Sequence, residues 1–170
     1  MISYPEATEY NPYYGQYIQH LKGENVLESL VKGVDEVNDL MASLTEEQLQ
    51  STYAEGKWTI KEVLQHIMDT ERIFCNRALR FARNDKTELP GYEQDEYVPF
   101  SGANERNSML MLREYNAIRQ ATITMFQCFT DEMFARVGVA SGSNMSVRAI
   151  AHVITGHERH HMNVLRERYL

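Results

Sequence analysis

The amino-acid sequence predicts an all-α protein, a four-helix bundle, from three observations. Apolar residues recur at steps of three and four in four long segments, which is the spacing of one buried helix face. No segment of useful length alternates apolar and polar residues in the manner of a half-buried strand. The chain has 170 residues, of which 43% are hydrophobic and 24% charged, and this suits one folded domain. We therefore expect a single bundle domain over residues 1–170.

The first predicted helix begins at residue 24 and ends at Ser43-Leu44-Thr45. Thr45 and Gln48 match a capping box, which predicts a short helical turn directly afterwards. A second capping box, Thr59 with Glu62, opens the second predicted helix, which Asn84 and Asp85 end. The buried stripes are Leu27, Leu30, Val34, Val37, Met41 and Leu44 in the first helix, and Ile60, Val63, Ile67, Thr70, Phe74 and Phe81 in the second.

Residues 85–104 predict a long loop between the second and third helices, because they carry two prolines and two glycines without a helical period. A connection of this length suits either antiparallel neighbours with a lid or a crossover between the ends of the bundle. Five of its side chains are candidates for shaping a pocket: Tyr92, Glu93, Asp95, Glu96 and Tyr97. The alternative is an acidic surface loop.

Asn104 is predicted to cap the third helix and Ser146 the fourth, with a loop of small residues at 138–144 between these helices. The stripes are Met111, Tyr115, Ile118, Thr122, Met125 and Phe129 in the third helix, and Val147, Ile150, Ile154, His157, His161 and Val164 in the fourth. Four stripes with this spacing predict a left-handed bundle.

The N-terminal region, residues 1–23, is rich in tyrosine. Tyrosine can bury its ring while its hydroxyl stays in water, so we expect an arm or short helix that covers one end of the bundle. A dimer contact and a substrate wall are the alternatives. The five tyrosines are Tyr4, Tyr10, Tyr13, Tyr14 and Tyr17.

Composition excludes several classes of partner. The formal net charge of −7 argues against nucleic acid and anionic membranes, which are bound largely through Lys and Arg. No run of 18 apolar residues is present, and residues 1–20 lack the pattern of a secretory signal peptide. The only two cysteines, Cys75 and Cys128, are interpreted as packing thiols in a reduced compartment. We therefore expect a cytoplasmic protein that acts on small molecules.

His157 and His161 occupy two successive positions of the last apolar stripe. The i, i+4 spacing places both imidazoles on one helix face, directed into the bundle. Two neutral imidazoles in a core each leave a donor and an acceptor to satisfy, at about 1 to 3 kcal/mol per unpaired group. A metal ion would take one nitrogen of each ring and leave the other N–H to an acceptor. From the residues alone, metal ligands and hydrogen-bonded core histidines both remain possible.

Residues 157–161 also match the H-E-x-x-H pattern of zinc proteases. The extended motif needs a glycine and a third histidine downstream, where this chain has Val164 and Glu167. Glu167 stays on the same helix, about 240° around from His161, so it cannot reach the same ion. A third ligand must therefore come from upstream.

His66 is the upstream candidate, because it flanks the buried stripe of the second helix; the alternative is a histidine that touches solvent. His20 and His152 are interpreted as surface or interface residues. His160 lies roughly 100° from His161 and is expected to point sideways, toward a neighbouring chain. The tyrosine-rich arm and His160 make a homodimer a further expectation.

Three segments of this sequence together resemble the DinB-like superfamily, which includes the YfiT-like metalloenzymes. They are Trp58 to His66 followed by Asp69 and Glu71, the loop from Leu89 to Tyr97, and Gly156 to His161. The resemblance covers the chain from about Tyr13 to Tyr169. It implies a four-helix bundle that holds one divalent metal ion per chain, nickel or zinc, through His66, His157 and His161. Most members of known activity are S-transferases or isomerases that use a low-molecular-weight thiol such as bacillithiol or mycothiol.

Three neutral ligands leave at least one metal position open, as in catalytic zinc sites. Such an ion lowers the pKa of bound water to about 7 or deprotonates a bound thiol. We therefore expect a metal-dependent, thiol-using S-transferase with a small-molecule substrate. A metal-dependent hydrolase and a non-catalytic, metal-stabilised binding protein are the alternatives.

Three further side chains have candidate roles at this site. Asp69 is a candidate acceptor for the free N–H of a ligand histidine, whereas Asp69 and Glu71 are alternatively solvated helix acids. Arg148, in the first turn of the last helix, is a candidate for holding an anionic substrate group. The sequence identifies no side chain as the catalytic acid, base or nucleophile.

Overall fold

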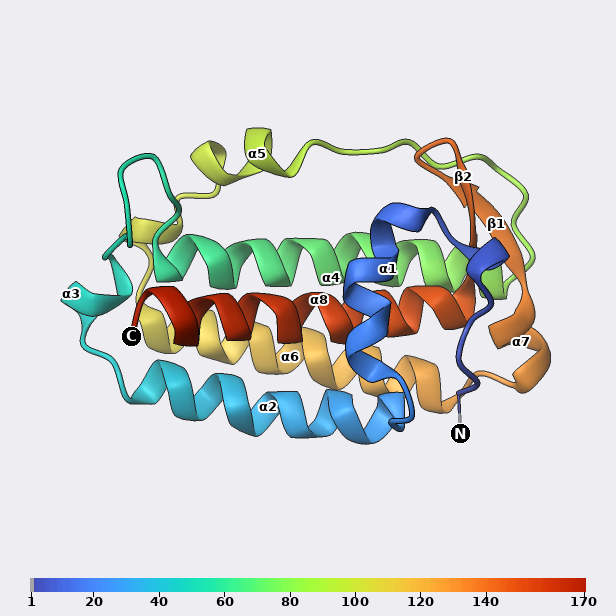
Figure 1. Ribbon diagram of the computed structural model, residues 1–170, viewed down its shortest axis with the longest axis horizontal. Coiled ribbons are helices and arrows are strands. Elements are labelled where there is room, and N and C mark those ends of the chain that lie inside the picture. The colour runs from blue at the N-terminus through green and yellow to red at the C-terminus, as the bar shows by residue number, and fades with distance from the viewer. Residues whose placement is uncertain (1) are drawn as a thin grey trace.

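The computed structural model describes residues 2–170, and its main elements are four long helices that pack side by side (Figure 1). This confirms the predicted all-α four-helix bundle. No helix among the described residues is long and apolar enough to cross a membrane. The four helices are α2 (Val26–Ala42), α4 (Ile60–Ala82), α6 (Ser108–Gln127) and α8 (Val147–Arg168).

Helix α4 packs against α8 and α6, and α2 packs against the same two helices from the other side. The colours in Figure 1 show that α4 and α6 both begin at the end where α2 and α8 finish. Because α4 and α6 are parallel, the chain must return along the bundle before α6 can start. Residues 83–107 make this crossover, which settles the topology that the sequence left open.

Three of the four predicted capping residues begin helices in the structure. Both predicted capping boxes are formed, at α3 (Glu46–Leu49) and at α4, and Ser146 caps α8. The prediction that Asn104 caps the third helix is wrong, because Asn107 caps α6. Asn104 instead accepts a hydrogen bond from Thr59 Oγ1 (2.7 Å), and this contact fastens the crossover to the start of α4.

The two predicted loops contain regular structure that the sequence analysis missed. The crossover includes α5 (Gln94–Tyr97) and the 3₁₀ turns Val98–Phe100 and Ala103–Glu105. After α7 (Asp131–Ala135), residues 137–146 form an antiparallel hairpin of β1 (Val137–Ala140) and β2 (Ser143–Ser146), in which Val137 pairs with Ser146. The strands read Val-Gly-Val-Ala and Ser-Asn-Met-Ser, so neither alternates apolar and polar residues as a half-buried strand would.

The N-terminal arm crosses the side of α8, and its first part contacts β2 and the start of α8, so it covers one end of the bundle only in part (Figure 1). It consists of α1 (Gly15–Ile18) and the 3₁₀ turns Ala7–Glu9, Pro12–Tyr14 and Gln19–Leu21. Gly156 permits this packing, since a Cβ at that position would lie 2.1 Å from the carbonyl oxygen of Tyr17. The glycine thus brings Tyr17 beside the middle of α8.

The core consists of two apolar clusters separated along the bundle by a polar layer. One cluster includes Leu30, Phe74, Phe126 and Ile150, and the other includes Val37, Met68, Met111 and Leu165. Each long helix contributes one residue to the layer between them: Gly33, Glu71, Arg119 and Glu158.

Candidate metal centre

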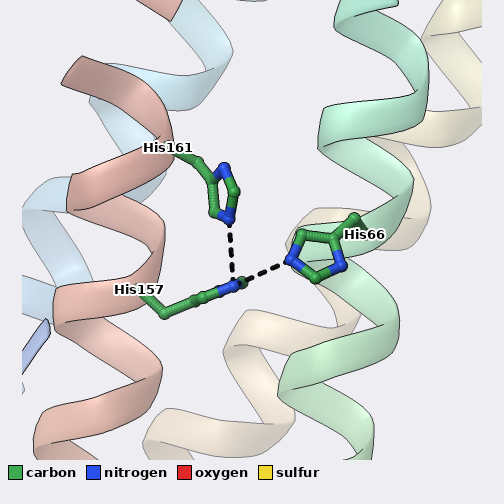
Figure 2. A group of neighbouring side chains, drawn as sticks. All are labelled: His66, His157 and His161. Carbon is green, nitrogen blue, oxygen red and sulfur yellow. Dashed lines mark hydrogen bonds between the residues drawn. The ribbon is translucent and has the colours of Figure 1, made fainter. Parts of the chain in front are cut away.

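Three of the six histidines come together between α4 and α8. Figure 2 shows His66 from α4 facing His157 and His161 from α8, with their ring nitrogens converging. The Nε2 atom of His157 lies 2.9 Å from that of His66 and 3.0 Å from that of His161. His66 and His157 are buried and His161 is half-buried. The structure therefore brings together the three residues that the resemblance predicted as ligands.

Burial keeps these imidazoles neutral. It lowers the pKa of His66 to about 4, and burial with the neighbouring His66 and His160 lowers that of His161 to about 3. Burial is the main cause that holds the pKa of His157 well below its usual value, and the neighbouring histidines lower it further. Near pH 7 each ring therefore offers a lone pair, which is the form that binds metal ions.

The arrangement fits one divalent cation. In a tetrahedral site with Zn–N bonds of 2.0–2.1 Å, ligand nitrogens lie about 3.3 Å apart. The two separations from His157, 2.9 and 3.0 Å, are close to this value, and all three ligand nitrogens lie within 4.8 Å of one another. Metal-binding histidines usually donate the other N–H to an oxygen. His66 has such a neighbour, because its Nδ1 lies 3.5 Å from Thr70 Oγ1, which in turn lies 2.8 Å from the Tyr92 hydroxyl.

Two cavities reach the cluster, which we call the His157 cavity and the His161 cavity after the ligand that each exposes. The His157 cavity, about 380 Å³, has a largely aromatic wall formed by Tyr13, Tyr14, Tyr17, Phe74 and Tyr92. The His161 cavity, about 590 Å³, is lined by residues that include Lys57, Trp58, Arg168 and Tyr169. Asp95 on α5 lines both. Small molecules can therefore approach the histidines by two routes.

Comparison with known proteins identifies the family of this chain. The model of the DinB superfamily matches residues 29–165. The chain belongs to the DinB superfamily. This confirms the resemblance found in the sequence, and the bundle described above is the form that the family takes in this chain.

Two curated relatives and one solved structure are similar to this DinB-superfamily chain. A "Putative metal-dependent hydrolase" from Geobacillus thermodenitrificans is 27% identical over 131 residues, covering 75% of this chain and 72% of the relative. Another from Oceanobacillus iheyensis is 23% identical over 129 residues, covering 74% and 73%. YfiT from Bacillus subtilis, described as "a probable metal-dependent hydrolase with an unusual four-helix bundle topology", superposes with a TM-score of 0.66 at 18% identity, covering 96% of this chain and 89% of YfiT. That likeness shows the shared fold.

The predicted pocket residues of the crossover are only partly at the site. Tyr92, Glu93 and Asp95 line the His157 cavity, as expected. Glu96 is exposed, and Tyr97 lines a separate surface hollow next to Arg72 and Arg80, because α5 turns these side chains away from the histidines. The substrate-wall alternative for the N-terminal tyrosines is supported by the places of Tyr13, Tyr14 and Tyr17 in that cavity.

The structure does not support the candidate roles of Asp69 and Arg148 at the site. Asp69 accepts a hydrogen bond from Gln65 Nε2 (2.8 Å) and lies 3.8 Å from Arg72, and the acceptor beside His66 is instead Thr70. Arg148 is engaged by the N-terminal arm, where its Nε donates to Glu9 Oε2 (2.7 Å). It is therefore not free to bind a substrate anion.

Glu71 and Glu158 are buried together rather than solvated or catalytic. Arg119 lies between them and donates to Glu71 Oε2 (2.8 Å) and Glu158 Oε1 (2.9 Å), and the Tyr115 hydroxyl donates to Glu158 Oε2 (2.7 Å). Glu158, the glutamate of the H-E-x-x-H pattern, thus faces away from the histidines. This position agrees with the exclusion of a zinc protease.

The burial of His152 and the exposure of Cys128 differ from what the sequence predicts. His152 is buried rather than at the surface, with Nδ1 2.8 Å from the Arg148 carbonyl oxygen, because the arm covers α8. His160 contacts the rings of Tyr17 and the half-buried His20 in its own chain. Cys75 packs against Thr122 as predicted, with Sγ 3.1 Å from Oγ1, but Cys128 is exposed because α6 ends before it.

Four residues have roles that the sequence did not predict: Trp58 and Thr70 beside His66, and Tyr115 and Arg119 in the buried polar layer. The position of Thr70 one turn after His66 was an available signal, since i, i+4 residues share a helix face. The ring of Trp58 lies 4.9 Å from that of His66 between centroids, and no local pattern announces this contact.

Proposed function

We propose that this DinB-superfamily chain binds one divalent metal ion, zinc or nickel, through Nε2 of His66, His157 and His161, and is a metal-dependent enzyme. The observation that carries the proposal is the convergence of three neutral imidazoles, whose ligand nitrogens all lie within 4.8 Å of one another where two cavities meet them. The descriptions of the two curated relatives as metal-dependent support it.

The residues of the chain hold the ion and shape its surroundings. When bound, the ion supplies a Lewis acid that lowers the pKa of a water or thiol in its open position. Thr70 and Tyr92 hold the ring of His66 in place, and Tyr17 packs on the ring of His157 at 5.2 Å between centroids.

The reaction that we propose is S-transfer from a low-molecular-weight thiol to a small electrophile. Two separate cavities give room for a thiol and a second substrate. Neither cysteine can supply the sulfur, since Cys75 packs against α6 and Cys128 is exposed at the end of that helix. In this reaction the thiol loses its proton, its sulfur bonds to the electrophile, and the leaving group departs with its electron pair.

A metal-dependent hydrolase is the second candidate, and the descriptions of both curated relatives favour it. Water would then be the nucleophile, and one cavity would be enough for the substrate. A panel of thiols with a chromogenic electrophile, run beside a panel of esters and amides without thiol, separates the two reactions. Turnover that requires a thiol supports S-transfer. Thiol-independent turnover supports hydrolysis, and a metal-loaded protein with neither activity is a binding protein.

Elemental analysis of protein purified without added metal tests the ligand set. We expect about one metal ion per chain, and its loss in His66→Ala, His157→Ala and His161→Ala while circular dichroism shows that the helices persist. His160→Ala is the matched control, since it removes a neighbouring imidazole outside the cluster and should keep the metal. Retention of the ion in all three ligand variants would contradict the proposed site.

A further inference from the structure

The His161 cavity contains two positive side chains that the metal site does not use. Lys57 precedes α4, and Arg168 is the last residue of α8. Among residues 2–170, neither lies within 4.0 Å of a carboxylate oxygen. Asp95 is the acidic side chain that lines the same cavity, so positive charge exceeds negative charge there. In a chain with a net charge of −7, this is a local reversal of sign.

Arg168 is held in position by an aromatic ring rather than by an acid. Its Nη1 donates to the Tyr53 hydroxyl at 3.2 Å, and its guanidinium carbon lies 5.5 Å from the centroid of the Tyr53 ring. A guanidinium has five N–H donors in a planar fork that matches a carboxylate. The contact with Tyr53 uses one donor and leaves others for a ligand.

An aromatic wall connects these cations with the histidines. Tyr53 and Tyr169 pack edge to face with centroids 4.9 Å apart, and the Tyr169 hydroxyl donates to the Trp58 carbonyl oxygen at 2.6 Å. The Trp58 ring in turn lies 4.9 Å from the His66 ring. The wall therefore offers an apolar, aromatic surface that connects Tyr53, on which Arg168 packs, with His66 of the histidine cluster.

We propose that the His161 cavity binds a small organic acid. Its carboxylate pairs with Lys57 and Arg168, and its flat apolar body lies along Trp58 and Tyr169 toward His161. That this acid is a substrate or cosubstrate rests on the proposed metal site. Binding of the acid does not, because the cations and the aromatic wall are independent of the histidines.

Trp58 provides the readout, because it is the single tryptophan of the chain and lines the cavity. The probes are benzoate and benzamide, which share a ring and a similar size and differ in charge. We expect benzoate to change the tryptophan fluorescence of metal-loaded protein at a concentration at least about tenfold below that needed for benzamide, and salt to reduce this difference. Equal binding of the two probes would overturn the proposal.

Paired variants locate the carboxylate. Lys57→Gln/Arg168→Gln should remove the preference for benzoate. Lys86→Gln/Arg113→Gln removes the same charge from exposed residues outside the cavity and should keep it. His157→Ala, which removes a proposed ligand without altering the cavity lining, should also keep it. A preference that survives the first double variant, or disappears in His157→Ala, would overturn the proposal, since the carboxylate would then bind elsewhere or on the metal. Metal content measured on the same samples tests the metal site separately.

Discussion

Arg119 is a completely buried cation with two buried carboxylates as partners. Burial alone would lower its pKa, but the charges of Glu158 and Glu71 outweigh that effect and hold the pKa well above its usual value. Gly33 belongs to the same arrangement, because a Cβ there would lie 2.2 Å from Glu158 Oε1. The polar layer between the two apolar clusters, which we call the charged layer, therefore depends on one residue from each long helix.

Arg119→Met tests this arrangement. It keeps a long apolar side chain but leaves Glu71 and Glu158 buried without their cation. We expect the free energy of unfolding to fall by about 3–5 kcal/mol, as for other buried pairs that lose one partner. Arg72→Met is the control, since its ion pair with Glu114 is partly exposed and should contribute about 0–1 kcal/mol. Urea denaturation measures both, and similar losses in the two variants would contradict the buried-charge argument.

Residues that belong to one helix were predictable, and residues that depend on partners in other helices were not. The pair His157 and His161 follows from a spacing of four. His66 needed the family resemblance, because its own helix leaves it at the edge of the stripe. Arg119 was missed because a single charge beside an apolar stripe normally faces water, and its partners lie on α4 and α8.

At the scale of elements, the contact between α1 and α8 places Tyr17 against His157 and makes one wall of the His157 cavity. We predict that Gly156→Ala separates these elements, because its Cβ would overlap the Tyr17 backbone. The expected cost is about 1–3 kcal/mol of folding free energy. Backbone hydrogen exchange in residues 13–21 should also become faster.

Gly15→Ala is the matched control for that prediction. The atom nearest to its added Cβ would be Tyr10 Cε2 at 4.0 Å, which is an ordinary contact. Hydrogen exchange in the arm should therefore stay close to that of the unchanged protein. Equal effects of the two substitutions would contradict the close approach of Tyr17 as the reason for a glycine at position 156, since alanine by itself favours a helix.

The residues at which helices begin are also predictable only where the capping contacts are local in the sequence. Thr59 and Glu62 begin α4 as predicted, because a capping box is complete within four residues. Asn104 and Asn107 are equally suitable caps in the sequence, and only the contact of Asn104 with Thr59 decides between them. The position of the hairpin depends on a contact with the crossover, which is distant in the sequence. The N–H of Leu89 donates to the Val139 carbonyl oxygen at 3.0 Å.

At the scale of the whole molecule, the crossover makes α4 and α6 parallel and lets residues from the loop reach the histidines (Figure 1). Loop length alone could not predict this topology. The two apolar clusters form only when all four helices are aligned along the bundle in one register. The charged layer between the clusters favours that register, because sliding one helix past the others would leave Arg119 or its two carboxylates buried without a partner.

The buried histidines predict how the stability of the metal-free protein depends on pH. Burial lowers the pKa of His66 to about 4 and, with its neighbours, that of His161 to about 3; burial also lowers those of His152 and His157. The usual value is about 6.5. Between about pH 4 and 6.5 the unfolded chain therefore binds more protons than the folded chain, so the free energy of unfolding must decrease as the pH falls.

Urea denaturation of chelator-treated protein at about pH 7 and pH 5 measures this effect. Each fully shifted histidine contributes up to about 1.4 kcal/mol per pH unit, and we expect a total loss of at least about 2 kcal/mol across the interval. His66→Gln should lose less over the same interval, because one proton-binding difference is removed. Asp69, whose pKa is raised by burial, acts in the opposite direction and limits the slope. A stability that stays constant from pH 7 to 5 would contradict neutral, buried imidazoles and, with them, the form in which these rings bind a metal ion.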